Sequence, residues 1–320
     1  MRNRNNGPVI SVVMPVYNEA DFLATAIESI LSQTFTSFEL IIIDDDSDDG
    51  SRSIAKEYAA ADCRISLIAH RQNRGNYPSR NEGMAAAQGE FIAVMDADDI
   101  SRPHRLERQA DFLSNHPSYS MVGSRVLLID ADGDPLGPME GIPLEHESID
   151  AALMDRSWAV VHPSVMLRME AVEAVGGYRE RFRTCADHDM YLRLAEISRV
   201  ANLPEILLYY RRHFGSMTLN KTDQRYNLRI IQRDARERRD LPPLDVEVPG
   251  IQEEKPMSQR DKIVAELKWA RLAGYNLYAK AFFKHIAYSL LLGPAVTSKE
   301  VFRYMTRILS LLYYRHEKTN

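Results

Sequence analysis

The sequence predicts an α/β protein with a mostly parallel central sheet, followed by a helical C-terminal appendage. Short apolar runs rich in β-branched residues alternate with stretches of helical periodicity along the first 100 residues, a pattern typical of β-α-β units. Two of these runs, at 40–43 and 91–95, show no polar alternation and end directly in clusters of aspartates. Runs of this kind are typical of strands that are covered on both faces of a parallel sheet.

The first part of the chain is expected to open with a strand at 9–14 and a helix that starts near Asp21, whose side chain is placed to cap it. The second strand ends at Asp44. Because strands alternate with helices, the sequence predicts parallel strands joined by right-handed crossovers. The elements that follow are a helix at 51–60, a strand at 65–69, a helix at 79–87 and a strand at 91–95.

The second part of the chain is expected to contain a hairpin. A strand at 122–129 runs into acidic turn residues at 130–135 and then into another short strand. After the hairpin the sequence predicts a strand at 164–168, helices at 169–175 and 187–197, and a strand at 207–211. Residues 240–258 carry four prolines among acidic residues and are interpreted as a linker, and helical periodicity returns at 263–270 and at 301–312.

The composition is that of an ordinary globular protein. With 320 residues, of which 45% are hydrophobic and 27% charged, the chain can bury a large core. Cys63 and Cys185 are far apart in sequence, which argues against a zinc cluster or a disulfide framework, and both are expected to be reduced in the cytosol. Neither the N-terminal residues nor the stretch 286–298, which is interrupted by Gly293 and Pro294, has the length of a membrane span.

Charge is distributed unevenly along the chain. Residues 260–320 contain eleven Lys or Arg and four Asp or Glu, a net charge of +7, so the other residues carry −12 of the total of −5. A basic, aromatic-rich tail on an acidic body indicates a cytoplasmic protein that makes peripheral contact with the anionic inner face of a membrane. The alternative is a helical cap whose basic face lies in solvent.

The two aspartate clusters are expected to form one site, because ligands bind beyond the carboxyl ends of the strands in open α/β sheets. Carboxylates gathered in one place repel one another unless a cation or hydroxyl groups balance them, and a nucleoside diphosphate with its metal supplies both. Neither a Gly-x-Gly-x-x-Gly turn nor a Gly-Lys-Ser/Thr loop is present. Residues 45–56 do not form a calcium-binding loop, because the twelfth position, which needs a carboxylate, is Lys56.

The sequence resembles the inverting glycosyltransferases of family 2, which have the GT-A fold, a nucleotide-binding α/β fold. The similar motifs occur in family order over residues 8–218, and the ordered set is far more specific than any one of them. They are SVVMPVYNE (11–19), IDDDSDDGS (43–51), NRG (73–75) with RN (80–81), MDADD (95–99), HPSVM (162–166), GGY (176–178), ADHD (186–189) with LRL (192–194), and YRRH (210–213) with GS (215–216).

The resemblance implies a nucleotide site at the ends of the first strands. Pro15, Tyr17 and Asp45 would hold the nucleobase, with the Tyr17 ring as a stacking face and Asp45 as an acceptor from a base N–H. Glu19 would help to hold the nucleotide, and it could equally serve the start of the following helix. Asp44 would support the loop. Arg80 is a candidate second cation near the nucleotide, and Tyr17 could instead be plain packing at a strand end.

The resemblance also implies a metal, Mn²⁺ or Mg²⁺, which prefers oxygen ligands. Asp98 would meet the ribose and Asp99 the metal, with Asp96 as a supporting carboxylate; the alternative is a charged loop that merely ends a strand. His213 lies where the family closes a loop over the diphosphate and would bind metal or phosphate, unless it only packs.

Asp187 is implied as the general base, because an inverting transfer needs one carboxylate to take the proton of the acceptor hydroxyl. The family pattern has Glu-Asp where this chain has Ala186 and Asp187, so the acceptor side of the site is the part in doubt. His162 is interpreted as structural.

These features predict a metal-dependent, inverting, hexosyltransferase-type enzyme. It would move a sugar from a nucleoside diphosphate sugar, by default a UDP-sugar, to a saccharide or lipid-linked acceptor in cell-surface polysaccharide biosynthesis, without a nucleic acid partner. The alternatives are a nucleotidyltransferase, disfavoured by the acidic, glycine-free loop at 16–20, and a non-catalytic nucleotide- or glycan-binding scaffold. The expected organisation is a catalytic domain at 8–225, a helix and Pro-rich acidic linker at 226–259, and a basic amphipathic helical region at 260–320.

Overall fold

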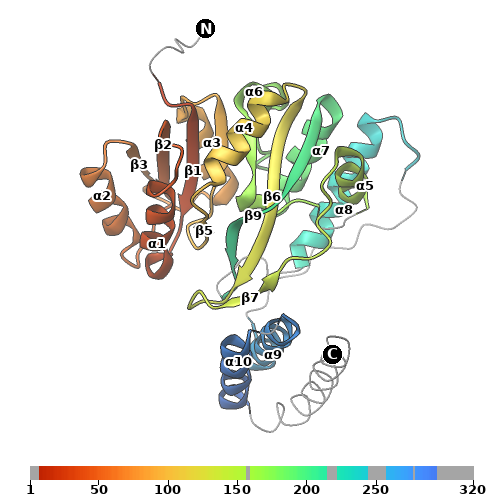
Figure 1. Cartoon of the computed structure of the whole chain (residues 1–320). Coiled ribbons are helices and arrows are strands. Elements are labelled where there is room, and N and C mark those ends of the chain that lie inside the picture. The colour runs from red at the N-terminus through yellow and green to blue at the C-terminus, as the bar shows by residue number, and fades with distance from the viewer. Residues whose placement is uncertain (1–6, 156–158, 215–221, 244–256, 277, 294–320) are drawn as a thin grey trace, which may run out of the picture. The chain divides into compact units, whose positions relative to one another are not determined.

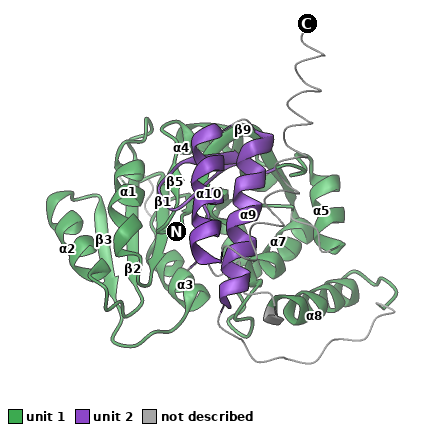
Figure 2. Ribbon diagram, turned by 90° about the horizontal axis from the view of Figure 1, so that it is seen from below, with its two compact units in different colours: residues 1–126, 140–210, 221–252 green, residues 127–139, 211–220, 253–320 purple. Residues whose placement is uncertain are grey.

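The computed structural model describes residues 7–155, 159–214, 222–243, 257–276 and 278–293. The chain forms two compact units, coloured green and purple in Figure 2. The first unit comprises residues 1–126, 140–210 and 221–252, and the second comprises residues 127–139, 211–220 and 253–320. Part of the predicted tail, residues 294–320, and most of the predicted linker, residues 244–256, lie outside the described residues.

The elements of the first unit alternate between strand and helix in the way that the sequence predicts, and Figure 1 labels them. In chain order they are β1 (Ile10–Val16), α1 (Ala20–Leu31), β2 (Phe38–Asp44), α2 (Ser51–Ala61), β3 (Ile65–Ala69), α3 (Asn76–Ala86), β4 (Phe91–Val94), β5 (Ile100–Ser101), α4 (Arg105–Asn115), β6 (Tyr119–Ile129), α5 (His146–Met154), the 3₁₀ turn η1 (His162–Ser164), β8 (Met166–Arg168), α6 (Met169–Val175), α7 (Ala186–Ile197), β9 (Arg199–Arg211) and α8 (Thr222–Arg238). Strands β6 and β9 continue into the second unit.

The central sheet has the strand order β3-β2-β1-β4-β8-β6-β9-β5, with β7 (Pro135–Pro138) paired to β6. Strands β3, β2, β1 and β4 are parallel, so their carboxyl ends share one edge of the sheet. From β4 onward the recorded pairings are antiparallel. The predicted fold class is therefore confirmed: a mixed α/β fold with parallel β-α-β units at its start, and helices at its C-terminal end.

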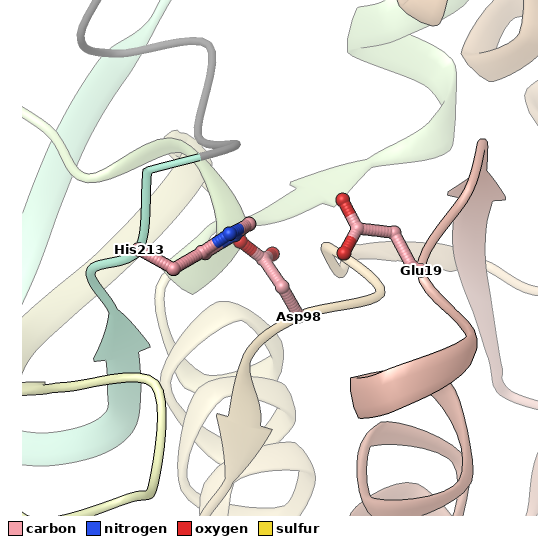
Figure 3. Close-up of side chains that lie close together, drawn as sticks. All are labelled: Glu19, Asp98 and His213. Carbon is pink, nitrogen blue, oxygen red and sulfur yellow. The ribbon is translucent and has the colours of Figure 1, made fainter.

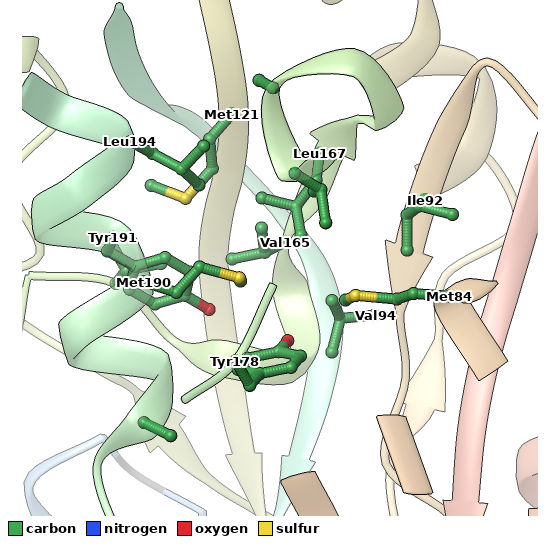
Figure 4. Close-up of a cluster of buried hydrophobic side chains, with 14 of the residues drawn as sticks. Met84, Ile92, Val94, Met121, Val165, Leu167, Tyr178, Met190, Tyr191 and Leu194 are labelled. Carbon is green, nitrogen blue, oxygen red and sulfur yellow. The ribbon is translucent and has the colours of Figure 1, made fainter. Parts of the chain in front are cut away.

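Helices cover both faces of this sheet (Figure 1). Helix α3 packs so closely that a Cβ on Gly83 would lie 2.6 Å from side-chain carbons of both Val13 and Ile43. The side chains of β1, β2 and α3 belong to the same buried cluster as those of β4, β8 and α7, part of which Figure 4 shows. This continuous core fixes α3 and α7 relative to the strand ends that precede them, which is what positions the candidate site.

Several details differ from the sequence prediction. Asp21 does not cap the first helix, because α1 already begins at Ala20 with Glu19 at the N-cap. Asp21 lies in the first turn, where its charge still faces the positive end of the helix dipole. Strand β9 begins at Arg199, well before residue 207, and α4, α5 and β5 were not predicted.

The second unit contains the predicted hairpin and two further helices, α9 (Gln259–Tyr275) and α10 (Ala279–Leu292). The hairpin is formed by β7 and the end of β6, which are antiparallel, and Ser258 and Asp261 form a capping box at the start of α9. Among the helices that the structure describes, none combines the length and the apolar character needed to cross a lipid bilayer.

Candidate functional site

The candidate site lies at the edge of the sheet where the parallel strands end. Strand β1 lies between β2 and β4 and is parallel to both, and Val16 is in register with Asp44. The loops after these three strands therefore start side by side. They carry the residues from 17 to 20, from 45 to 50 and from 95 to 99, so the two aspartate clusters meet at one edge, as the sequence predicts.

The loops after β1 and β2 are joined by hydrogen bonds into one rim. The backbone N–H of Asn18 donates to Ser47 Oγ (3.1 Å), that of Glu19 to Ser51 Oγ (2.9 Å), and that of Ala20 to Asp49 Oδ2 (2.9 Å). Burial would raise the pKa of Asp49, but the hydrogen bonds that it accepts lower it. Tyr17 stands on this rim with 51% of its surface exposed, which leaves its ring open to stacking.

Asp45 is buried and organises the loop that leads into α3. Its Oδ1 accepts the backbone N–H of Arg74 (2.9 Å) and lies 2.6 Å from Nδ1 of His70, and its Oδ2 accepts the N–H of Gly75 (2.7 Å). Asp44, also buried, forms an ion pair with Arg52, in keeping with a supporting role. Pro15 lies within β1 and is partly exposed. The roles of Pro15, Tyr17 and Asp45 toward a nucleobase stay predictions.

Three carboxylates gather in the loop after β4. Asp96, Asp98 and Asp99 each offer an oxygen within 4.8 Å of the others. Asp99 has 0% exposure, whereas Asp98 is partly exposed. Figure 3 shows Asp98 and Glu19, and oxygens of these two carboxylates also lie within 4.8 Å of one another. Such an all-oxygen set suits Mg²⁺ or Mn²⁺, which prefer hard oxygen ligands.

Two buried guanidinium groups lie beside these carboxylates. Arg80 of α3 forms an ion pair with Asp96. Burial raises the pKa of the Asp96 carboxyl, Arg80 opposes this rise, and the nearby charges of Asp98 and Asp187 add to it. Arg105, at the start of α4, donates to the carbonyl oxygen of Val94 (2.7 Å). Burial lowers the pKa of Arg105 to about 10, against the opposing charges of Asp99 and Asp96.

Asp187 lies in the first turn of α7, where the positive end of the helix dipole favours a negative charge. Its Oδ1 accepts a hydrogen bond from the hydroxyl of Tyr77 (3.0 Å), and its Oδ2 lies 4.0 Å from Nδ1 of His162. Tyr77, which bonds to Asp187, lies three residues before Arg80, which pairs with Asp96, so the two carboxylates lie beside the same turn of α3. The structure thus brings Asp187 and the acidic group after β4 to one site.

His162 lies close to Asp187, with 13% of its side chain exposed. Its Nδ1 contacts the hydroxyl of Tyr191, and its Nε2 lies 3.3 Å from the hydroxyl of Tyr178. Burial and the positive charge of Arg80 lower the pKa of His162 to about 3, despite the opposing charge of Asp187. The imidazole is therefore neutral at physiological pH, which suits the structural role that the sequence indicates.

His213 and Ala186 are the remaining residues to which the sequence drew attention. His213 follows the end of β9 and belongs to the second unit, so its role as a metal ligand stays a prediction. Ala186 is fully buried in the apolar cluster. Sequence reasoning missed Tyr77 and Arg105 as neighbours of the site. Arg105 belongs to no motif. Tyr77 lies three residues before Arg80, and this spacing places both on one face of a helix, so it could have been predicted as a neighbour of the site.

Comparison with known proteins places this geometry in a family. The sequence model described as Glycosyl transferase family 2 matches residues 11–176. The "Putative glycosyltransferase EpsE" of Bacillus subtilis (strain 168) is 39% identical over 211 residues, which cover 65% of this chain and 74% of EpsE. Chondroitin synthase of Escherichia coli is 26% identical over 217 residues, which cover 68% of this chain and 31% of that protein.

Solved structures share the fold at low sequence identity. TarS (residues 1–349) of S. aureus in complex with UDP-GlcNAc has a TM-score of 0.59 and 15% identity, covering 90% of this chain and 82% of that one. The mannosyltransferase PcManGT from Pyrobaculum calidifontis, in complex with GDP-Man and Mn²⁺, has a TM-score of 0.56 and 16% identity, covering 97% of this chain and 85% of that one. These similarities confirm the GT-A type of fold.

Proposed function

This chain belongs to glycosyl transferase family 2, and from that membership we propose that it moves a sugar from a nucleoside diphosphate sugar to a saccharide or lipid-linked acceptor, with inversion at the sugar C1. The observation that carries the proposal is an acidic group, Asp96, Asp98 and Asp99, together with a separately held carboxylate, Asp187, which contacts the same turn of α3 as Asp96 does. A transferase of this kind needs one group for the departing diphosphate and another for the attacking hydroxyl.

Asp187 is the proposed general base. Its carboxylate takes the proton of the acceptor hydroxyl while the acceptor oxygen forms a bond to C1 and the bond from C1 to the diphosphate oxygen breaks, with the electron pair leaving on the diphosphate. Attack from the face opposite the diphosphate inverts the configuration at C1. One catalytic carboxylate suffices, because the departing diphosphate needs neutralisation of its negative charge and not a proton from a second carboxyl group.

Mn²⁺ or Mg²⁺ is the proposed cofactor. Asp99, with Asp96 in support, would hold the ion, with His213 as a further proposed ligand and the partly exposed Asp98 within reach of the same ion. When bound, the ion neutralises the charge that develops on the departing diphosphate. The Mn²⁺ in the PcManGT structure supports this choice, and so does the all-oxygen donor set.

The proposed donor is a UDP-sugar, with GDP- and dTDP-sugars as the nearest alternatives. Pro15, Tyr17 and Asp45 would hold the nucleobase, Glu19 and Asp98 would contact the rest of the nucleotide, and the Arg80 guanidinium would add positive charge beside it. UDP-GlcNAc in TarS and GDP-Man in PcManGT support a nucleoside diphosphate sugar in general.

The proposed setting is cell-surface polysaccharide biosynthesis at the cytoplasmic side of a membrane. A relative of Bacillus subtilis (strain 168) described as "Putative teichuronic acid biosynthesis glycosyltransferase TuaG", 31% identical over 216 residues, supports the pathway class. Peripheral membrane contact is proposed through the basic C-terminal region, where Lys268 and Arg271 are exposed on α9 and Phe283 and Leu291 on α10. The proposed catalytic domain spans residues 8–225.

A donor screen followed by a turnover assay tests the proposal. UDP-Glc, UDP-GlcNAc, UDP-Gal and GDP-Man are compared with Mn²⁺ by thermal shift, because a matched ligand raises the apparent stability. Release of nucleoside diphosphate is then measured for wild type, Asp187→Asn and the control Asp111→Asn, an exposed aspartate on α4.

We expect a loss of about 1,000-fold for Asp187→Asn, none for Asp111→Asn, and no turnover in EDTA until Mn²⁺ is restored. Full turnover by Asp187→Asn would remove Asp187 as the base, and turnover that is indifferent to EDTA would remove the metal.

A further inference from the structure

A tyrosine on α3 holds the proposed base. The hydroxyl of Tyr77 donates to Oδ1 of Asp187 over 3.0 Å. Only 7% of Tyr77 is exposed, and its ring packs against the ring of Tyr178, with the centroids 5.3 Å apart. Burial and the charge of Asp187 raise the pKa of Tyr77 well above 10, so its hydroxyl keeps its proton and remains a donor at physiological pH.

The same turn of α3 also contacts the acidic group. Arg80 follows Tyr77 by three residues, so both side chains project from one face of the helix. Tyr77 bonds to Asp187 while Arg80 pairs with Asp96, and this turn therefore links the proposed base to the carboxylates proposed for the donor side. The tight contact of Gly83 with Val13 and Ile43 fixes the helix against the sheet.

The two oxygens of Asp187 have different surroundings. Oδ1 accepts the Tyr77 hydrogen bond, whereas Oδ2 is 4.0 Å from Nδ1 of His162, which is too long for a hydrogen bond. A carboxylate that is held by one oxygen presents the other in a defined direction. Rotation of Asp187 away from this direction would break the bond to Tyr77.

We propose that Tyr77 is a positioning residue, which fixes the Asp187 carboxylate so that Oδ2 takes the proton of the acceptor hydroxyl. This inference rests on the proposed function of Asp187. Tyr77 does not touch the reacting atoms. It acts by keeping the base in its productive orientation and at a constant separation from the donor side of the site.

The first test is Tyr77→Phe, which removes the hydroxyl and keeps the ring. We expect the kcat for the sugar nucleotide with the highest turnover in the screen above to fall about tenfold or more, while the KM for that donor stays within about twofold. The matched control is Tyr191→Phe, a buried tyrosine whose hydroxyl contacts His162 rather than Asp187. It is expected to keep kcat within about threefold.

Combining Tyr77→Phe with Asp187→Asn separates positioning from general destabilisation. If Tyr77 acts through Asp187, its substitution has no further effect on the residual turnover of Asp187→Asn, and the two changes are non-additive. Equal multiplicative losses in both backgrounds would overturn the proposal. So would an unchanged kcat in Tyr77→Phe.

A readout that needs no sugar donor keeps this test separate from the proposed function. In crystal structures of wild type and Tyr77→Phe with UDP and Mn²⁺, we expect one Asp187 side-chain conformer in wild type and a rotated or divided one in the variant. An identical, single conformer in both overturns the positioning role. Full activity of Asp187→Asn would instead overturn the assignment of the base, whatever Tyr77 does.

Discussion

At the residue scale, the neighbours Asp98 and Asp99 differ in their access to a ligand. Asp98 is partly exposed and lies close to Glu19, whereas Asp99 has no exposed surface and lies near the Arg105 charge. We predict that Asp98→Asn weakens Mn²⁺ binding in the presence of UDP at least tenfold with little change in thermal midpoint. Asp99→Asn is predicted to lower stability by about 1 kcal/mol or more, because the buried Arg105 guanidinium loses one of the two negative charges near it.

Isothermal titration with Mn²⁺ and thermal unfolding measure these two effects separately. A variant of Asp99 with native stability and no Mn²⁺ binding would show that Asp99 is the main metal ligand and that Asp98 serves the ribose, as the sequence alone suggests.

His162 makes the stability of the fold depend on pH. An unfolded histidine binds a proton below about pH 6.5, whereas burial keeps His162 neutral down to about pH 3. The unfolded chain therefore binds more protons in this window, and the free energy of unfolding falls as the pH falls. We predict that His162→Gln reduces this slope by about 1.4 kcal/mol per pH unit between pH 4 and 6, measured by urea unfolding.

The control for this prediction is His104→Gln, an exposed histidine at the start of α4. Its slope should match that of the wild type. Equal slopes for wild type and His162→Gln would mean that His162 is protonated in the folded protein.

Sequence reasoning found the site residues that belong to motifs and missed those that tie the motifs together. Asp45, Asp98 and Asp187 follow strands or open helices, and their order along the chain marks them. The bond from Tyr77 to Asp187 spans 110 positions, so its existence depends on the packing of α3 against α7. No local pattern encodes such a contact.

At the element scale, the turn between β6 and β7 is held to α10 by charge. Lys284 contacts three aspartates of this turn, Asp130, Asp132 and Asp134, while Nε2 of His285 lies 3.0 Å from Asp130 Oδ2. Burial would raise the pKa of Asp130, but the hydrogen bonds from His285 and Lys284 lower it to about 2. The Lys284 ammonium group thus occupies the position that a cation would take among these carboxylates.

We predict that Lys284→Met destabilises the second unit by about 3 kcal/mol, because three carboxylates, one of them buried, lose their shared partner. Lys280→Met, on the same helix, should cost less than about 1 kcal/mol, since its side chain is 82% exposed against 15% for Lys284. Hydrogen exchange in α9 and α10 measures the difference. Equal protection of these amides from exchange in the two variants would contradict the idea that Lys284 holds the turn to α10.

The elements that the sequence predicts well are those with strong local signals. Strand β3 and helix α6 have the predicted bounds, because apolar runs and a Gly176-Gly177 break delimit them. Helix α4 was missed because a fully buried arginine and glutamine, Arg105 and Gln109, interrupt its apolar stripe. Both side chains donate to strand carbonyl oxygens, Arg105 to that of Val94 and Gln109 to that of Val122, and these long-range partners leave no pattern within the helix.

At the scale of the whole molecule, the two parts of the chain carry opposite net charges, so the proposed membrane contact should depend on the basic part alone. Residues 260–320 carry +7 and the rest −12, so only the basic region is attracted to an anionic surface. We predict that Lys268→Gln with Arg271→Gln weakens flotation with vesicles rich in phosphatidylglycerol about 30-fold, at about 1 kcal/mol per charge. Salt should also weaken membrane binding of the wild type, because the Debye length shrinks to about 3 Å at 1 M.

The control pair Arg108→Gln with Arg125→Gln removes two exposed charges from the first unit and should leave flotation unchanged. Equal binding to neutral phosphatidylcholine vesicles, or equal loss in both pairs, would mean that the basic face of α9 does not direct the protein to a membrane.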